Sequence, residues 1–396
     1  MPTLQHALHT LTDRIHAARA DGTSLQIRGG GSKDFLGTSQ GAVLDTRALN
    51  GVISYEPTEL VVTVSAGTPL DELEALLAEK NQYLPFEPPH FRWNPGGRAT
   101  VGGMVACGLA GPARASVGGV RDYVLGLHLI NGLGQHLRFG GQVMKNVAGY
   151  DVSRLMVGAY GTLGLLTEIS LKVLPIPPAE ATLRFVLEQG EALAYLHRWG
   201  AQPLPLNASN WLLDDAAPGH AAQPVLYLRL RGAAAAVEAA CRRLLAEVPG
   251  ERLDNAQTAP DWTLCRNQQL PFFTRPRQPD AVLWRLSVPQ TTPVLALPGQ
   301  PLVDWHGGLR WLWAPLSAQA ELQTLARQVG GHASMFAGGQ SDATSIASRL
   351  RSADAVLQGI AERLKTSFDP AHIFNPGFNV KHLHALAHHS AHVHKS

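Results

Sequence analysis

Glycine is concentrated between residues 94 and 119, where it makes up 8 of 26 residues, against 39 of 396 in the whole chain. Because glycine has no Cβ, backbone amides can turn toward a ligand and approach it closely, as binding a pyrophosphate through N–H groups requires. A flexible surface loop is the alternative interpretation. However, apolar residues such as Val101, Met104 and Leu109 stand among the glycines, where a solvated linker would carry serine, glutamine or lysine. The segment is therefore predicted to bind a ligand.

A second glycine cluster follows a short strand predicted over residues 24–28. It consists of a cation, three glycines, a hydroxyl and a second cation, namely Arg28, Gly29, Gly30, Gly31, Ser32 and Lys33. Free amides, a hydroxyl donor and two cations form an arrangement that binds anions. The cluster lacks the glycine-lysine-serine/threonine order of a P-loop and does not match the dinucleotide fingerprint, so a tight turn remains an alternative.

A third glycine-rich stretch, residues 158–164, spaces its glycines at every third position and runs into a strand rich in leucine and isoleucine. This spacing again brings backbone close to a flat or phosphorylated group. Three such segments in the first half of the chain are hard to explain as independent loops. Together they predict one extended ligand, and FAD, whose adenine, pyrophosphate and isoalloxazine spread along a groove, would need several contact segments.

The elements that must position these segments follow from the apolar pattern. An amphipathic helix with apolar residues at 4, 8, 11 and 15 opens the chain. A further helix is predicted to begin at Thr68 as N-cap with Pro69 as first helical residue, and to run to about Lys80. Strands are predicted over residues 42–45, 51–55, 60–64, 123–130 and 135–139, the last two forming a hairpin.

Composition limits the kind of protein. Lysine and arginine number 33 against 31 acidic residues, and no basic run with aromatics appears, so nucleic-acid binding is not expected. The three cysteines, Cys107, Cys241 and Cys265, are too far apart for a disulfide framework or an iron–sulfur or CxxC metal site. A reducing cytoplasm is expected, with no bound metal. No window is long and apolar enough to span a bilayer, so membrane contact is expected to be peripheral at most.

Four segments together resemble the FAD-binding domain of the vanillyl-alcohol-oxidase/para-cresol-methylhydroxylase (PCMH) class. They are RGGGSK (residues 28–33), PGGRATVGGMVA (95–106), GYDVSRLMVGAYGTLGLLTEISLKVLP (149–175) and SFDPAHIFNPG (367–377). More narrowly, they resemble the FAD-binding subunits of bacterial glycolate oxidases. The resemblance is close over residues 1–178 and looser to about residue 378.

The resemblance implies a role for each segment. The first would wrap the pyrophosphate, the second would contact pyrophosphate and flavin ring, and the third with its following strand would contact ribose and adenine. The implied residues are Gly29, Gly30, Gly31, Ser32 and Lys33, with Arg28 added for its charge; then Pro95, Gly96, Thr100, Gly102, Gly103 and Ala106; then Gly161, Thr162, Gly164, Leu165 and Ile169. Relatives that bind flavin covalently present histidine or cysteine near one of these turns. Non-covalent FAD is expected here, with Cys107 and His90 as the alternative attachment points.

After the prolines at 175–178 the pattern changes to alternating strands and helices. Strands are predicted over residues 181–187, 225–231, 281–288 and 311–313, and helices over 190–199, 233–248, 317–329 and 345–365. The fold class is therefore α+β: a two-part PCMH-type FAD-binding domain (1–178), an α+β cap domain (179–380) with an antiparallel sheet and helices on one face, and a histidine-rich tail (381–396), expected to be disordered. The resemblance implies that the last helix returns Asn375 to the FAD domain.

The cap departs from its catalytic relatives. Related glycolate and D-lactate flavoproteins carry a cap motif H-x-G-D-G-N-x-H, whose histidines help to bind the metal and the hydroxy acid and to deprotonate it. At the matching place this chain has residues 304–311, DWHGGLRW, with a single histidine. His306 is a candidate base and Arg310 a candidate carboxylate ligand. The alternatives are a hydrogen-bonded cap histidine and a salt-bridged arginine.

These observations predict an FAD-dependent subunit of a glycolate-oxidising complex. Flavin electrons need an acceptor, and the chain has no cluster site, so the resemblance points to a catalytic FAD subunit and an iron–sulfur subunit as partners. The expected substrate is a small 2-hydroxy acid. The expected location is the cytoplasm, with any contact with the inner face of the plasma membrane made through partners. The alternatives are a self-sufficient dehydrogenase or oxidase of D-lactate or an alcohol, and a structural subunit without flavin.

Overall fold

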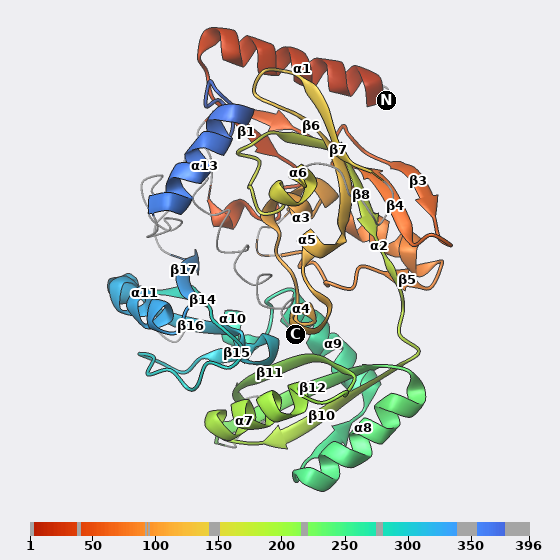
Figure 1. Cartoon of the computed structure of the whole chain (residues 1–396), viewed down its shortest axis with the longest axis vertical. Coiled ribbons are helices and arrows are strands. Elements are labelled where there is room, and N and C mark those ends of the chain that lie inside the picture. Colours follow the sequence, from red (N-terminus) through yellow and green to blue (C-terminus); the bar gives the residue numbers. More distant parts are fainter. Residues whose placement is uncertain are drawn as a thin grey trace.

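The computed structural model describes residues 4–37, 41–91, 93, 96–141, 151–214, 221–274, 280–338 and 355–376. Two sheets organise these residues, one in the upper and one in the lower half of the molecule (Figure 1). Pro95, the first part of the helix predicted over 345–365, and the histidine-rich tail lie outside the described residues. Within the described ranges, no helix is long and apolar enough to cross a membrane.

A five-stranded antiparallel sheet carries the N-terminal half. Its order is β3 (Val52–Glu56), β4 (Val61–Ser65), β8 (Leu165–Lys172), β6 (Val124–Ile130) and β7 (His136–Gly140). The β-branched run in β4 is buried along its whole length, as suits a strand inside a sheet. The predicted hairpin is confirmed, because β6 and β7 pair antiparallel. A separate two-stranded sheet joins β5 (Gln82–Tyr83) to β9 (Leu174–Pro175).

Short helices share one hydrophobic core with this sheet. They are α2 (Leu70–Ala78), α3 (Val101–Cys107), α5 (Val120–Tyr123), α6 (Val152–Leu155) and α13 (Ala355–Phe368), with α4 (Arg114–Val117) beside them. The N-cap of α2 is Pro69, so the predicted cap at Thr68 was wrong. The Thr68 hydroxyl instead accepts a hydrogen bond of 3.0 Å from the amide of Gly51, which ties α2 to the start of β3.

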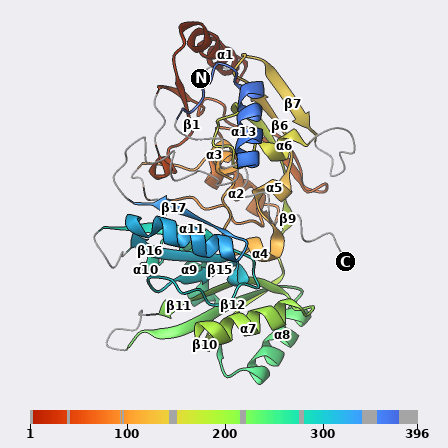
Figure 2. The ribbon, with the colours of Figure 1, turned by 60° about the vertical axis from the view of Figure 1, so that its left-hand side comes forward.

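Helix α1 and the segment that follows α13 pack in one hydrophobic core. Helix α1 (Leu4–Asp21) packs on the parallel pair β1 (Leu25–Arg28) and β2 (Ala42–Asp45), followed by the 3-10 helix η1 (Asp34–Leu36). Leu25 donates its amide to the carbonyl of Ile373 at 2.7 Å. Figure 2 shows α13 in the same half as α1. The C-terminal segment therefore packs with the first sheet, as expected for Asn375, although it follows the second sheet in sequence.

An eight-stranded antiparallel sheet fills the lower half. Its order is β13 (Glu251–Leu253), β10 (Ala179–Val186), β12 (Gln223–Gly232), β11 (Leu206–Asp214), β15 (Leu302–Asp304), β16 (Leu309–Pro315), β14 (Ala281–Ser287) and β17 (His332–Ala337). The sequence predicted β10, β12, β14 and β16. It missed the strands that lie between and beside them, β11, β13, β15 and β17.

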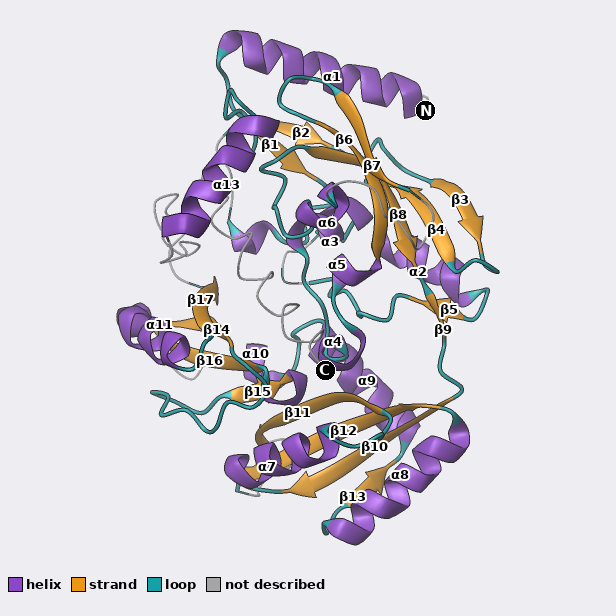
Figure 3. Cartoon of the chain, in the orientation of Figure 1, coloured by secondary structure: helices purple, strands orange, loops and turns teal. Residues whose placement is uncertain are grey.

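Helices lie on both faces of this sheet (Figure 3). Helices α7 (Gln189–Gly200), α8 (Ala234–Glu247) and α11 (Gln319–Gln328) pack on one face, as expected. Helix α9 (Asn255–Arg266) lies on the other face. Its Trp262 donates the indole N–H to Thr182 on β10, whereas the neighbouring Ala181 and Leu183 face α7 and α8 on the opposite side. The expectation of helices on one face was therefore wrong for α9. The remaining short elements are α10 (Pro271–Thr274), η2 (Trp305–Gly307) and η3 (Leu316–Ala318).

Candidate functional site

The three glycine-rich segments come together along one groove in the N-terminal half. The loop after β1, the start of α3 and the loop before β8 form its walls. Most of the residues predicted to bind the cofactor line it: Arg28, Gly29, Gly30, Gly31, Ser32, Lys33, Thr100, Gly102, Gly103, Ala106, Gly161 and Gly164. Segments separated by more than a hundred residues thus share one ligand-sized surface.

Four other predicted contact residues lie away from the lining, and a fifth, Pro95, is outside the described residues. Gly96 stands in an exposed turn with φ of 80°. The Thr162 hydroxyl donates to a backbone carbonyl in its own turn at 2.6 Å. Leu165 and Ile169 are fully buried in two hydrophobic cores. Gly96 therefore serves its turn, and the other three side chains serve packing or local turn structure.

Charge in the groove favours an anion. The described lining holds three basic residues and one acidic residue, Asp34. The Arg28 guanidinium pairs with the Asp34 carboxylate at 2.6 Å. Its charge is therefore already balanced, which argues against its predicted role as a phosphate ligand. Arg98 pairs with surface carboxylates. Lys33 contacts the Ser32 hydroxyl at 3.4 Å and the Phe91 ring, pairs with no carboxylate among the described residues, and has its pKa lowered by burial. Among the described lining residues, Lys33 is therefore the cation available to a diphosphate.

The first glycine turn lies directly against the segment before α3. The carbonyl of Gly30 accepts a 2.8 Å hydrogen bond from the amide of Arg98. A Cβ on Gly30 would stand 1.7 Å from the Arg98 carbonyl oxygen, and one on Gly29 would stand 2.5 Å from the Thr100 hydroxyl. That hydroxyl in turn caps α3 by accepting from the amide of Gly103. The glycines are thus required for close contact between two walls of the groove.

Asn375, expected at the FAD domain, joins the groove's walls from the far end of the chain, a role that the sequence did not specify. The Asn375 amide donates to the carbonyl of Tyr160 at 2.7 Å, and its oxygen accepts from the amide of Ile27 at 2.7 Å. Asn375 and Tyr160 both line the groove. The asparagine-proline-glycine motif at 375–377 was the available signal, but the motif alone did not reveal which two segments it would join.

His306, the candidate base, has both ring nitrogens occupied. Its Nε2 lies 3.0 Å from the Ser116 hydroxyl and its Nδ1 lies 2.9 Å from the Ser209 hydroxyl. Burial lowers its pKa to about 4, so the ring is neutral at pH 7. It does not line the groove. These contacts favour the alternative role, a cap histidine that joins the loop around α4 to the eight-stranded sheet.

Arg310, the candidate carboxylate ligand, is also bonded internally. Its guanidinium donates to the carbonyls of Gly307 and Thr292, and burial lowers its pKa to about 10. It therefore stabilises the end of η2, with two of its N–H donors bonded to backbone carbonyls. Across the described ranges, no group of three or more histidine, cysteine, aspartate and glutamate side chains comes together as a metal site.

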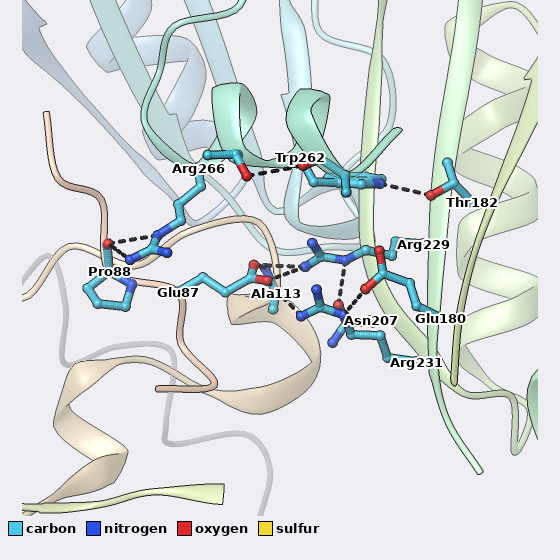
Figure 4. A network of polar contacts seen from close by, with 12 residues as sticks. Glu87, Pro88, Ala113, Glu180, Thr182, Asn207, Arg229, Arg231, Trp262 and Arg266 are labelled. Carbon is cyan, nitrogen blue, oxygen red and sulfur yellow. Dashed lines mark hydrogen bonds and ion pairs between the residues drawn. The ribbon is translucent and has the colours of Figure 1, made fainter. Parts of the chain in front are cut away.

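A buried ion cluster joins the two halves (Figure 4). Glu87, from the loop after β5, accepts hydrogen bonds from Arg229 at 2.7 Å and Arg231 at 2.9 Å on β12. Burial would raise the pKa of Glu87, but the two arginines outweigh it and the net pKa is lowered. The same carboxylate accepts from the amide of Ala113 near α4. Arg266 on α9 adds a bond to the carbonyl of Pro88. The cluster fixes the eight-stranded sheet against the N-terminal half.

Comparison with known proteins defines the class. A family model described as an FAD binding domain matches residues 8–140. A solved structure, alkyldihydroxyacetonephosphate synthase, shares the fold with a TM-score of 0.63 at 15% identity, covering 92% of this chain and 74% of that chain. Fold, groove and family model together define a flavoprotein oxidoreductase with a PCMH-type FAD-binding domain.

Sequence comparison then gives the family. The glycolate oxidase subunit GlcE of Escherichia coli K12 is 45% identical over 370 residues, covering 93% of this chain and 95% of that protein. This chain belongs to the GlcE family of glycolate oxidase subunits. Glycolate oxidase subunit GlcD of Bacillus subtilis 168 is 32% identical over 40% of this chain and 32% of its own length. D-lactate dehydrogenase of Anaerostipes hadrus is 35% identical over 36% of this chain and 29% of its own.

Proposed function

We propose that this chain is the FAD-binding subunit of a glycolate oxidase (glycolate dehydrogenase) complex that oxidises glycolate to glyoxylate. The observation that carries the proposal is the 45% identity with glycolate oxidase subunit GlcE over 93% of the chain. The groove of glycine-rich segments supports it, because it offers backbone and a cation where a dinucleotide needs them. The proposed domains are residues 1–178 for FAD and 179–380 for the cap, with 355–376 returning to the first.

The chain's own residues bind and orient the cofactor in this proposal. FAD supplies the acceptor for hydride removed from a CH–OH group. The backbone of Gly29, Gly30 and Gly31 approaches the diphosphate, and Lys33 offsets its charge. An aromatic cluster packs beside Lys33, which lines the groove; it consists of Phe35, Phe91, Trp93 and Phe336.

Non-covalent FAD is part of the proposal. Cys107 lines the groove, but burial raises its pKa to about 11, so the reactive thiolate form is scarce at neutral pH. His90 is held by Glu74 at 2.9 Å and does not line the groove. Acid precipitation of the holoprotein should therefore release the yellow flavin into the supernatant. Flavin that stays with the precipitate would show a covalent bond, and Cys107→Ser and His90→Gln would then identify it.

An electron acceptor on another subunit completes the proposal. The sequence has only three cysteines, all buried and unpaired, which cannot form a four-cysteine cluster. We therefore place an iron–sulfur subunit and a catalytic FAD subunit beside this chain. The complex is proposed to work in the cytoplasm, where its partners would make any contact with the membrane.

The test compares the FAD-loaded chain alone with the reconstituted complex. Glycolate-dependent dye reduction should be weak or absent for the chain alone and strong for the complex, because His306 and Arg310 are both bonded internally. D-lactate is assayed in parallel. Strong turnover by the chain alone, lost in His306→Ala, would overturn the proposal in favour of a self-sufficient 2-hydroxy acid dehydrogenase. A complex that keeps full activity when this chain is left out would overturn it as well.

A further inference from the structure

The segment that follows α13 lies beside β1 as a short parallel extension of the two-stranded sheet. Leu25 donates its amide to the carbonyl of Ile373 at 2.7 Å, and Asn375 donates its amide to the carbonyl of Leu25 at 2.8 Å. Phe374 thereby forms a parallel bridge with Leu25. Because β1 runs directly into the first glycine turn, residues 373–375 hold the strand that leads to that turn.

A buried ion pair fixes the path of this segment. Lys365, on α13, donates to the Asp369 carboxylate at 2.5 Å. Lys365 is 7% exposed and Asp369 is 0% exposed. The same carboxylate accepts hydrogen bonds from the amides of Ile373 at 3.1 Å and Phe374 at 2.9 Å. The pair therefore sets the backbone immediately before Asn375.

The same ammonium also reaches the third glycine-rich segment, residues 158–164. Lys365 donates to the carbonyl of Thr162 at 2.6 Å and to that of Phe374 at 3.1 Å. Thr162 stands between Gly161 and Gly164, which line the groove. All three N–H donors of the ammonium are thus used, and they join this glycine turn to the C-terminal segment.

Asn375 brings this arrangement to the groove itself. Its side chain bonds to the carbonyl of Tyr160 and the amide of Ile27, and a Cβ on Gly161 would stand 2.8 Å from its amide nitrogen. Asn375 has a φ of 44°, in the left-handed region that asparagine adopts more readily than most residues. The position of Asn375 between two walls of the groove is therefore closely defined.

The ion pair is better suited to fixing an arrangement than to adding stability. Taking two charges out of water is costly, and a buried pair can often be replaced by apolar residues without loss of stability. Burial lowers the pKa of Lys365, and the charge of Asp369 opposes that shift. The bonds of the pair are complete only when α13, the third glycine turn and residues 373–375 are all in place.

We propose that Lys365 and Asp369 are positioning residues for FAD, which act through Asn375 and the turn at residues 158–164. Docking of the C-terminal segment and binding of FAD are then linked, and each favours the other by the same factor. The cofactor site is completed only by residues that follow the eight-stranded sheet in sequence. The inference concerns the cofactor and is independent of the substrate proposed above.

Amide hydrogen exchange of the full wild-type chain, with and without FAD, tests the linkage. FAD should slow exchange at the amides of Ile373, Phe374 and Asn375, by up to about a hundredfold when free FAD is about 100 times its Kd, because opening this segment releases the cofactor. The amides of α8, which packs on the eight-stranded sheet, are the control and should slow less. Slowing at residues 373–375 no greater than in α8 would overturn the inference.

Variants test the route through Asn375. Lys365→Met removes three donated bonds and should weaken FAD binding by about tenfold to a hundredfold, measured by the change in flavin fluorescence on titration. Asn375→Gly, which avoids strain at a positive φ, should also weaken it. The two losses should not add in the double variant, because both act on the same contacts. Arg363→Met removes an exposed cation from the same helix and is the matched control, with unchanged affinity expected.

Circular dichroism and the free energy of unfolding of the FAD-free protein are measured for each variant. Should Lys365→Met fail to fold, the exchange experiment, which needs no variant, still decides. Unchanged FAD affinity in folded Lys365→Met, or losses that add fully in the double variant, would reject the positioning role. A wild-type chain that binds FAD without the linkage rejects this inference alone, whereas a wild-type chain that takes up no FAD rejects the proposed function as well.

Discussion

Replacing Gly30 with alanine should abolish FAD binding. The new methyl carbon would stand 1.7 Å from the Arg98 carbonyl oxygen, a backbone atom that cannot rotate away. The two glycine-rich walls would be forced apart, and the Arg98 amide would lose its 2.8 Å hydrogen bond to the carbonyl of Gly30. The expected result is colourless protein after purification, measured as flavin absorbance per chain after incubation with excess FAD.

The expected loss does not require a charged side chain. Because the glycine turn is predicted to bind an anion, an aspartate at Gly30 would be expected to act by repelling phosphate oxygens. The side-chain direction at Gly30 instead leads into the segment before α3, so an aspartate would clash with protein before it met the cofactor. Alanine is therefore sufficient, and a charge is unnecessary. Wild-type flavin occupancy in folded Gly30→Ala would show that this turn does not shape the groove.

Controls separate loss of cofactor from loss of fold. Gly200→Ala adds the same methyl group where nothing lies within 4 Å, and should keep full occupancy. His306→Ala should also keep it, because that ring does not line the groove. Lys33→Met leaves the backbone unchanged and should weaken FAD binding by about tenfold to a hundredfold through loss of a charge-assisted contact. Unchanged affinity in Lys33→Met would place the phosphates elsewhere.

The sequence predicted best what depends on local pattern. The β-branched run of β4 and the turn between β6 and β7 predicted those strands with only small errors at their ends. The glycine clusters likewise indicated which segments form the groove, since close backbone approach requires residues without a Cβ. Arg28 shows the limit of this reasoning. A cation beside a glycine turn suggests phosphate, but Asp34, six residues on, already pairs with it.

What the sequence could not give depends on contacts between distant residues. Strand β11 lies inside the sheet but carries polar residues, so its sequence lacks a simple apolar alternation. Their partners come from other elements: Asn210 bonds to Cys265, and Ser209 bonds to His306. His306 and Arg310 looked available because their partners come from other elements.

The contact between the two halves depends on Glu87, and Glu87→Gln should lower the free energy of unfolding by about 3–5 kcal/mol. The glutamine keeps the shape of the side chain but leaves Arg229, which is 2% exposed, without a carboxylate. Arg231 keeps Glu180 as a partner, so the penalty arises mainly at Arg229. Urea unfolding followed by tryptophan fluorescence measures the loss. Glu238→Gln, which breaks an exposed pair with Arg252, is the control and should cost under about 1 kcal/mol.

The pH dependence of stability provides a second test of the Glu87 cluster, and its direction follows from the pKa of Glu87. The folded pKa of Glu87 lies below its ordinary value of 4.5, so folding favours the ionised form. The stabilisation from Glu87 is therefore complete above about pH 4.5 and is lost as the pH falls through the lower, folded value. The difference in stability between wild type and Glu87→Gln should accordingly be constant near neutrality and shrink in acid. A loss no larger than that of Glu238→Gln, or a difference that grows in acid, would show that the two halves are held together by their apolar contacts and not by this buried ion cluster.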